Sequence, residues 1–178
     1  PWVRAEAFES AVNVLLREHR VSFELSSGEM VPFESLEMHT AVVMPAIRLL
    51  ARTEGFESAE AAYRDALAEI ASNHAGNSIT DAATALQETL TALGCVGNAL
   101  GPLIKSARAK GLLGAHDTPM VESMDKVAQW VSADRSERGD AHKATDASIE
   151  DAWLTVHVVG ALIVRLSQSI GERAAALE

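Results

Sequence analysis

The segment SIEDAWLTVHVVGALIVRL, residues 148–166, decides how the rest of this chain must fold. Ser148 is followed three residues later by Asp151, which is the spacing of a capping box at the start of a helix. From Ala152 to Leu166, apolar residues occupy nearly every face of the predicted helix. A helix that is apolar all round is covered by neighbouring helices or by a partner subunit. The segment therefore predicts a central helix, and it is too short and too interrupted to span a membrane.

The composition of the chain also favours helices packed on helices. Apolar residues make up 48% of the 178 residues but aromatic residues only 4%, whereas a β-sandwich would contain more aromatic and β-branched side chains. The net charge of -10 means that any contact with nucleic acid has to be local. The composition therefore predicts a protein of the all-α class. A single cysteine, Cys95, excludes a disulfide framework, so we expect the protein to be cytoplasmic.

Helical periodicity accounts for most of the remaining chain. It predicts helices over residues 2–19, 36–52, 56–72, 78–93, 100–111 and from 118 to near Gly139. A second capping box, Ser78 to Asp81, is expected to start one of them. Pro45 lies inside another and predicts a kink or two short helices, because proline lacks an N–H and clashes with the preceding turn. Gly160 and Ala161 would allow a neighbouring helix to approach the central one closely.

One short stretch changes period and predicts a small N-terminal β-hairpin. Val21, Phe23 and Leu25 alternate with polar residues before the turn sequence 26–28, and the strand pattern ends at Pro32. The polar stretch 73–77 predicts a loop that divides the chain into residues 1–75 and 76–178. The first range is either a separate helical segment with the hairpin or part of the same domain as the second.

The stretch Arg135-Ser136-Glu137-Arg138-Gly139-Asp140-Ala141-His142 concentrates the residue types used in catalysis. If the helix ends near its glycine, the first arginine and the histidine can point into one hollow. Histidine acts as a general acid or base near neutral pH, and arginine offers a fork of donors to phosphate oxygens. Such a pair suffices for metal-independent RNA cleavage through attack of the ribose 2′-hydroxyl. On spacing alone, a solvated turn with incidental ion pairs is the more common outcome.

The other candidate residues are weaker. The remaining histidines are scattered without the partners that a metal site needs, so we expect no metal and no cofactor. His157 lies on the central helix and is expected to be a hydrogen-bonded core residue or part of an interface. Glu88 either orients Arg135 from a neighbouring helix or is a solvent-facing acid, and Cys95 is expected to be a small apolar filler.

An ordered set of segments resembles a known domain. These segments are Thr84–Glu88, Leu93–Cys95, Leu100–Ile104, Trp130–Ser132, Arg135 through Gly139-Asp140-Ala141-His142, and Asp151–His157. Over residues 76–170 the chain is similar to the C-terminal domain of bacterial abortive-infection proteins, which belongs to the HEPN superfamily. The resemblance implies an α-helical bundle, and many members are metal-independent endoribonucleases with an Arg-x4–6-His motif. Many dimerise so that two motifs face each other, and their biology is often phage defence or toxin–antitoxin control.

Carried over by position, Arg135 matches the motif arginine, His142 matches the motif histidine, and Asp140 belongs to the Gly-Asp pair that often precedes it. Ser136 stands where the family often has a polar amide, and Arg138 supplies a second arginine within the motif.

These matches lead to two hypotheses. The first is a homodimeric endoribonuclease that acts on RNA as a toxin or phage-defence effector, with Arg135 and His142 catalytic and with Ser136, Arg138, Asp140 and Glu88 supporting. The alternative is a catalytically inactive helical module that dimerises and binds RNA or a partner protein such as an antitoxin. Neither hypothesis places the chain in a membrane.

Overall fold

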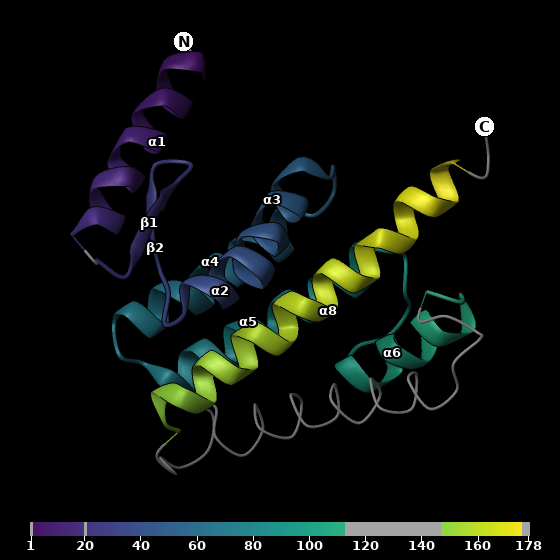
Figure 1. Ribbon diagram of the computed structural model, residues 1–178. Helices are drawn as coiled ribbons and strands as arrows, with labels where there is room; N and C mark the ends of the chain where they lie inside the picture. The colour runs from purple at the N-terminus through teal and green to yellow at the C-terminus, as the bar shows by residue number, and fades with distance from the viewer. Residues whose placement is uncertain (1, 20, 113–146, 176–178) are drawn as a thin grey trace.

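The computed structural model describes residues 2–19, 21–112 and 147–175 of the chain (Figure 1). Its elements in chain order are α1 (Trp2–Glu18), β1 (Phe23–Ser26), β2 (Glu29–Pro32), α2 (Leu36–Met38), the π-helical turn η1 (His39–Val43), α3 (Met44–Arg52), α4 (Glu57–Ala71), α5 (Ala75–Ala92), α6 (Leu100–Ala109) and α8 (Ile149–Ala175). The predicted all-α fold with a small N-terminal hairpin is confirmed. The helix predicted from Thr118 lies outside the described residues.

Helix α8 is the central element of the fold. It packs mainly against α5 and also contacts η1, α3 and α4, and Figure 1 shows it lying across the molecule between α1 with the hairpin on one side and α6 on the other. Its inward face is fully buried in the core, from Ala152 through Val159 to Leu166. Leu154 is 52% exposed and Ala161 is also exposed, so within this chain the helix is covered on its inward face, and cover of the outer face by a partner subunit stays a prediction.

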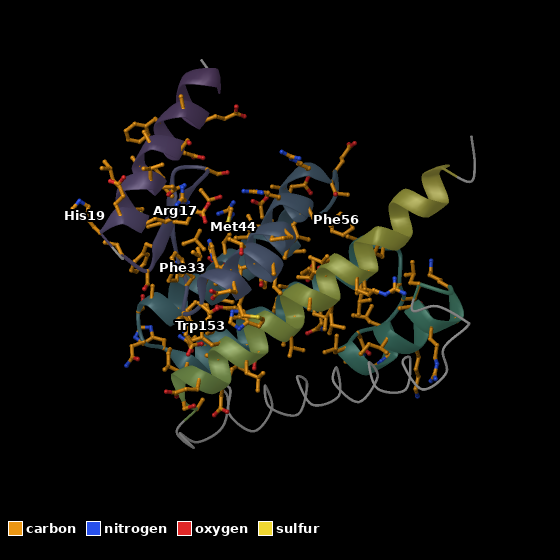
Figure 2. All side chains as sticks on the ribbon, viewed as in Figure 1. Arg17, His19, Phe33, Met44, Phe56 and Trp153 are labelled. Carbon is orange, nitrogen blue, oxygen red and sulfur yellow. The ribbon has the colours of Figure 1, made fainter. Side chains whose placement is uncertain are left out.

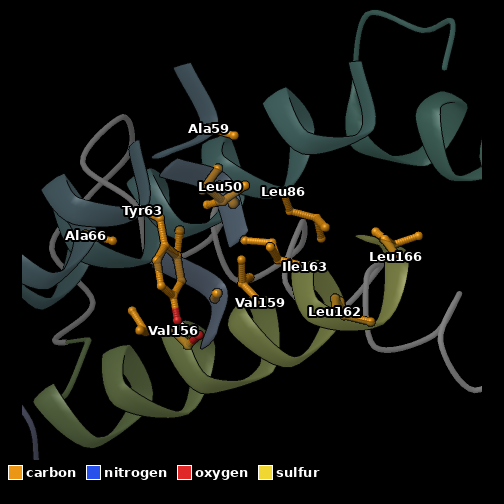
Figure 3. Close-up of a cluster of buried hydrophobic side chains, with 14 of the residues drawn as sticks. Leu50, Ala59, Tyr63, Ala66, Leu86, Val156, Val159, Leu162, Ile163 and Leu166 are labelled. Carbon is orange, nitrogen blue, oxygen red and sulfur yellow. Dashed lines mark hydrogen bonds between the residues drawn. The ribbon is translucent and has the colours of Figure 1, made fainter. Parts of the chain in front are cut away.

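Two local predictions for α8 are confirmed. The capping box forms, since the Asp151 N–H donates to Ser148 Oγ at 3.2 Å and the Ser148 N–H donates to Asp151 Oδ2 at 3.3 Å. At Gly160 a neighbouring helix does approach closely, since the buried side chain of Tyr63 on α4 occupies the place that a Cβ would take. The Tyr63 hydroxyl donates to the Val156 carbonyl oxygen at 3.0 Å, which ties α4 to α8 (Figure 3).

The kink or division into two short helices that Pro45 predicts takes the form of a π-helical turn, η1, between the short helices α2 and α3. The Met44 N–H donates to the carbonyl oxygen of His39, five residues earlier, so the turn just before the proline is wider than an α-helical one. Proline has no N–H to donate and its ring needs room beside the preceding turn. The wide turn supplies that room, and α2, η1 and α3 follow one another without an intervening loop.

The hairpin forms as predicted and holds α1. Strands β1 and β2 pair antiparallel, and the turn between them uses Ser27 at φ 53° and Gly28 at φ 84°, as a tight two-residue connection requires. Asn13 of α1 is buried against the hairpin, where its amide donates to the Leu25 carbonyl oxygen at 2.9 Å and accepts from the Leu25 N–H at 2.7 Å. This side chain therefore bonds to both polar groups of one strand residue and fixes α1 on β1.

The second capping-box prediction is wrong. Helix α5 begins at Ala75, so Ser78 lies inside its first turns, completely buried, with no hydrogen-bond partner for its hydroxyl. The predicted loop shrinks to the sharp turn at Asn73, which has φ 61°. Because the turn is short, α4 and α5 pack along each other, and buried residues on both sides of the turn form one continuous core.

Candidate functional site

Most of the residues predicted to form the catalytic site lie outside the described part of the chain. This holds for Arg135, Ser136, Arg138, Asp140 and His142, so their geometry stays a prediction.

Glu88, the remaining candidate, is half-buried on α5. Segments that carry the family resemblance lie on α5, α6 and α8, and the structure packs α5 against both of the other helices.

The described residues form a different polar site, a cleft between α1, the β1–β2 turn and α3. The cleft has a volume of about 960 Å³ and is lined by four arginines, Arg17, Arg48, Arg52 and Arg64. We call this the arginine cleft. Arg17 and Met44, both labelled in Figure 2, belong to different walls of the arginine cleft.

Three helices place these arginines. Arg48 and Arg52 are one helical turn apart on the exposed side of α3, whose opposite side buries Ile47 and Leu50. Arg17 comes from the last turn of α1, and Arg64 comes from α4. All four arginines line the same cleft because the hairpin holds α1 opposite α3.

Two of the three carboxylates in the cleft lining, Glu9 and Glu24, are engaged by the fold, whereas Glu6 makes no ion pair within the described residues. Glu9 accepts a hydrogen bond from the Gly28 N–H at 3.0 Å, and Glu24 pairs with His39. Arg64 is held by Glu60 at 2.9 Å and by Glu29 at 3.1 Å. Within the described part of the chain, Arg17, Arg48 and Arg52 make no ion pair.

His39 and Glu24 form a buried pair behind the cleft. The Nε2 atom of His39 lies 2.7 Å from Glu24 Oε2, and the imidazole is completely buried beside the ring of Phe33. Burial lowers the pKa of His39, an effect that Glu24 opposes and Arg48 reinforces. A neutral imidazole that donates from Nε2 has no proton on Nδ1, so the lack of any hydrogen-bond partner at Nδ1 leaves no N–H group buried without an acceptor. His39 thus orients Glu24 and is too deeply buried to meet a substrate.

His157 does not occupy the predicted hydrogen-bonded core position. It is half-buried, stacks on Trp153 with ring centroids 5.4 Å apart, and makes no hydrogen bond with a described residue. Burial lowers the pKa of His157, with Glu34 opposing the shift and His39 adding to it. Cys95 packs as the predicted filler, and burial raises the pKa of its thiol.

Two features are absent from the described residues. Residues 2–19, 21–112 and 147–175 contain no group of three His, Cys, Asp or Glu side chains that could hold a metal ion. In the same residues, no helix combines the length and the hydropathy needed to cross a lipid bilayer.

Sequence reasoning missed the arginine cleft and the His39–Glu24 pair. The cleft arginines are distributed over α1, α3 and α4, and only the four-residue spacing of Arg48 and Arg52 is visible along the sequence. The pairing of His39 with Glu24 depends on how the hairpin folds back onto η1, which no local pattern encodes.

The comparisons with known proteins give no assignment. No protein-family model matches the chain, and no curated protein or solved structure is significantly similar to it.

Proposed function

We propose that the chain is a metal-independent endoribonuclease of the HEPN type that acts as a toxin or phage-defence effector. The observation that carries the proposal is the ordered series of segments that resemble the abortive-infection C-terminal domain and include Arg135 and His142. In this proposal two copies of the chain dimerise, and their motifs face a shared RNA substrate.

The described fold supports this proposal in two ways. The chain is a helical bundle, and its segments with family resemblance on α5, α6 and α8 belong to helices that pack together. The capping box at Ser148 also fixes the start of α8 at Ile149, seven residues after His142. The motif therefore precedes the central helix of the core by seven residues along the chain.

The proposed chemistry divides the work between the two residues. His142 removes the proton from the ribose 2′-hydroxyl or donates a proton to the departing 5′-oxygen. Arg135 binds the scissile phosphate and stabilises the charge that develops on it during attack. The 2′-oxygen attacks phosphorus and the bond to the 5′-oxygen breaks, which leaves one fragment with a 2′,3′-cyclic phosphate and the other with a 5′-hydroxyl.

The test is RNA cleavage by the purified chain in the presence of a chelator. We expect cyclic-phosphate products from the parent and a rate loss of about 100-fold or more in His142→Ala, the typical contribution of a general acid or base. His19→Ala is the matched control, because His19 is an exposed histidine beyond the end of α1, and it should cleave at the parental rate. The absence of cleavage, or equal rates for His142→Ala and the parent, would reject the proposal.

The alternative function is a catalytically inactive interaction module. The observation that favours it is the apolar surface of α1, where Phe8 is 63% and Leu15 is 55% exposed on a chain whose net charge is -10. A module of this kind would bind a protein partner through α1. Parental binding of RNA or of a partner without cleavage, lost in a Phe8→Ser, Leu15→Ser double variant, would support this alternative.

A further inference from the structure

We propose that the arginine cleft is a binding site for a phosphate-bearing ligand of nucleotide size, formed by residues other than those of the predicted catalytic motif. Arg17, Arg48 and Arg52 hold the phosphate groups, and Phe8 on the wall formed by α1 stacks against the base. The proposal does not depend on the chain cleaving RNA.

The first argument is the balance of charges that are free to bind a ligand. Among the described residues the three arginines have no ion-pair partner, whereas only one of the three glutamates in the same lining, Glu6, is likewise unengaged, since Glu9 bonds to Gly28 and Glu24 pairs with His39. The chain as a whole has ten more acidic than basic residues, so a group of unpaired arginines in one cleft is opposite in sign to the net charge of the chain. Arginine forks match phosphate oxygens with two parallel hydrogen bonds.

The second argument is the form of the cleft. Its volume of about 960 Å³ lies at the upper end of the range for small-molecule sites, which is about 300–1,000 Å³. The cleft also has apolar lining from Phe8, Leu25 and Met44, so it offers a flat ligand a hydrophobic wall beside the cations. A mixture of cations with one exposed aromatic ring is the combination by which proteins bind a base and its phosphate.

The third argument is the way the walls are fixed. Asn13 fastens α1 to β1 through two hydrogen bonds, and the salt bridge from Arg64 to Glu29 joins the hairpin to α4, where Glu60 holds the same arginine from one turn earlier in the helix. The arginines of α1 and α3 are thus held opposite each other before a ligand arrives. Preorganised groups lose less conformational freedom on binding.

The experiment measures binding separately from cleavage. Isothermal titration uses pyrophosphate and ADP, and fluorescence anisotropy uses a labelled hexanucleotide whose 2′-positions are methylated so that it cannot be cut. ADP binding that the hexanucleotide does not displace identifies a free nucleotide as the ligand. Tight binding of the hexanucleotide that ADP displaces weakly identifies an RNA strand.

The decisive variant is Arg48→Gln with Arg52→Gln, which removes two exposed charges from α3. We expect it to weaken binding of ADP or of the hexanucleotide by about tenfold or more. For the hexanucleotide, the slope of log affinity against log salt should become shallower by about 1.4, since each phosphate contact on a single strand contributes about 0.7. Lys105→Gln with Arg165→Gln removes two exposed charges elsewhere and should bind as the parent does.

Two further variants complete the test. Phe8→Ala should weaken ADP binding and leave pyrophosphate binding unchanged, and His142→Ala should bind ADP as the parent does even where cleavage is lost. If the double arginine variant does not fold by circular dichroism, Arg17→Gln replaces it, because Arg17 is exposed at the end of α1. The proposal is overturned if no probe binds, if a folded arginine variant binds like the parent, or if the control variant loses as much affinity.

Discussion

Replacing Gly160 by alanine tests the packing of α8 on α4 more directly than any other change. A Cβ at this position would fall far inside van der Waals contact with the Tyr63 hydroxyl oxygen, and it would lie 2.9 Å from Val42 Cγ1 and 3.2 Å from Tyr63 Cζ. Tyr63 is completely buried and its hydroxyl is bonded to α8, so the ring cannot swing away into solvent. The added methyl group must therefore displace α4, η1 or α8.

The net change in stability follows from three opposing contributions. Overpacking a close-packed core costs about 1–3 kcal/mol. Loss of the Tyr63 hydrogen bond destabilises the fold by about 1 kcal/mol more, and the better helix propensity of alanine stabilises it by about 1 kcal/mol. We therefore expect Gly160→Ala to lower the free energy of unfolding by about 1–3 kcal/mol, which for a chain of this size lowers Tm by roughly 2–4 °C per kcal/mol.

The assay is denaturant unfolding followed by circular dichroism at the helix band, with a matched glycine as the control. Gly101 in the first turn of α6 is exposed, and a Cβ there would meet nothing within 4 Å. Gly101→Ala should leave stability unchanged or raise it by up to about 1 kcal/mol. The cost of Gly160→Ala should also fall by about 1 kcal/mol in a Tyr63→Phe background, which removes the hydroxyl that the methyl group meets. Equal effects of the two glycine substitutions, or no coupling to Tyr63→Phe, would refute this account of the packing.

The remaining predictions concern the cap of α8, the attachment of α1 and the buried histidine. Ser148→Ala should cost about 1 kcal/mol in denaturant unfolding, because it removes the oxygen that accepts from the Asp151 N–H; an unchanged midpoint would contradict the cap. Asn13→Ala leaves both polar groups of Leu25 without their partner, so amide hydrogen exchange in α1 should accelerate while exchange in α8 stays slow. Burial lowers the pKa of His39, so the unfolded state takes up its proton first as the pH falls. Stability should be full above about pH 6.5 and decrease below it, and His39→Gln should make that decrease smaller than in the parent.

Local sequence patterns predicted the elements whose signals are contained within a few residues. The hairpin followed from alternation around a turn sequence, and the start of α8 followed from the spacing of Ser148 and Asp151. Periodicity also placed α1, α4 and α6 close to their observed bounds. In these cases the local preference and the tertiary environment favour the same conformation.

The prediction that failed depends on tertiary packing. Ser78 has the spacing of a cap, but α5 starts at Ala75 because the helix gains more by packing its first turn against α4. At Pro45 the sequence predicted a kink or two short helices, and the structure adds that the two short helices α2 and α3 are joined by the widened turn of η1.

The two candidate sites also differ in whether a local sequence pattern reveals them. The motif from Arg135 to His142 is contiguous and can be found by reading the sequence, although its geometry lies outside the described residues. The arginine cleft cannot be found by reading, because Arg17 and Arg48 are brought opposite each other only by the hairpin between their helices. The residues of a site assembled from distant helices have no fixed separation along the sequence by which the site could be predicted.

The π-helical turn η1 sets the angle, about the helix axis, between α3 and the part of the chain that precedes η1. Each residue advances an α-helix by about 100°, so the extra residue in η1 turns everything before it by that angle relative to α3. Deleting one residue within 39–43 would restore an ordinary helix but carry His39 away from Glu24 and the hairpin away from Arg48 and Arg52. Insertions and deletions should therefore be tolerated much less in this turn than in the loop around Gly55, where a turn at φ 86° faces open space.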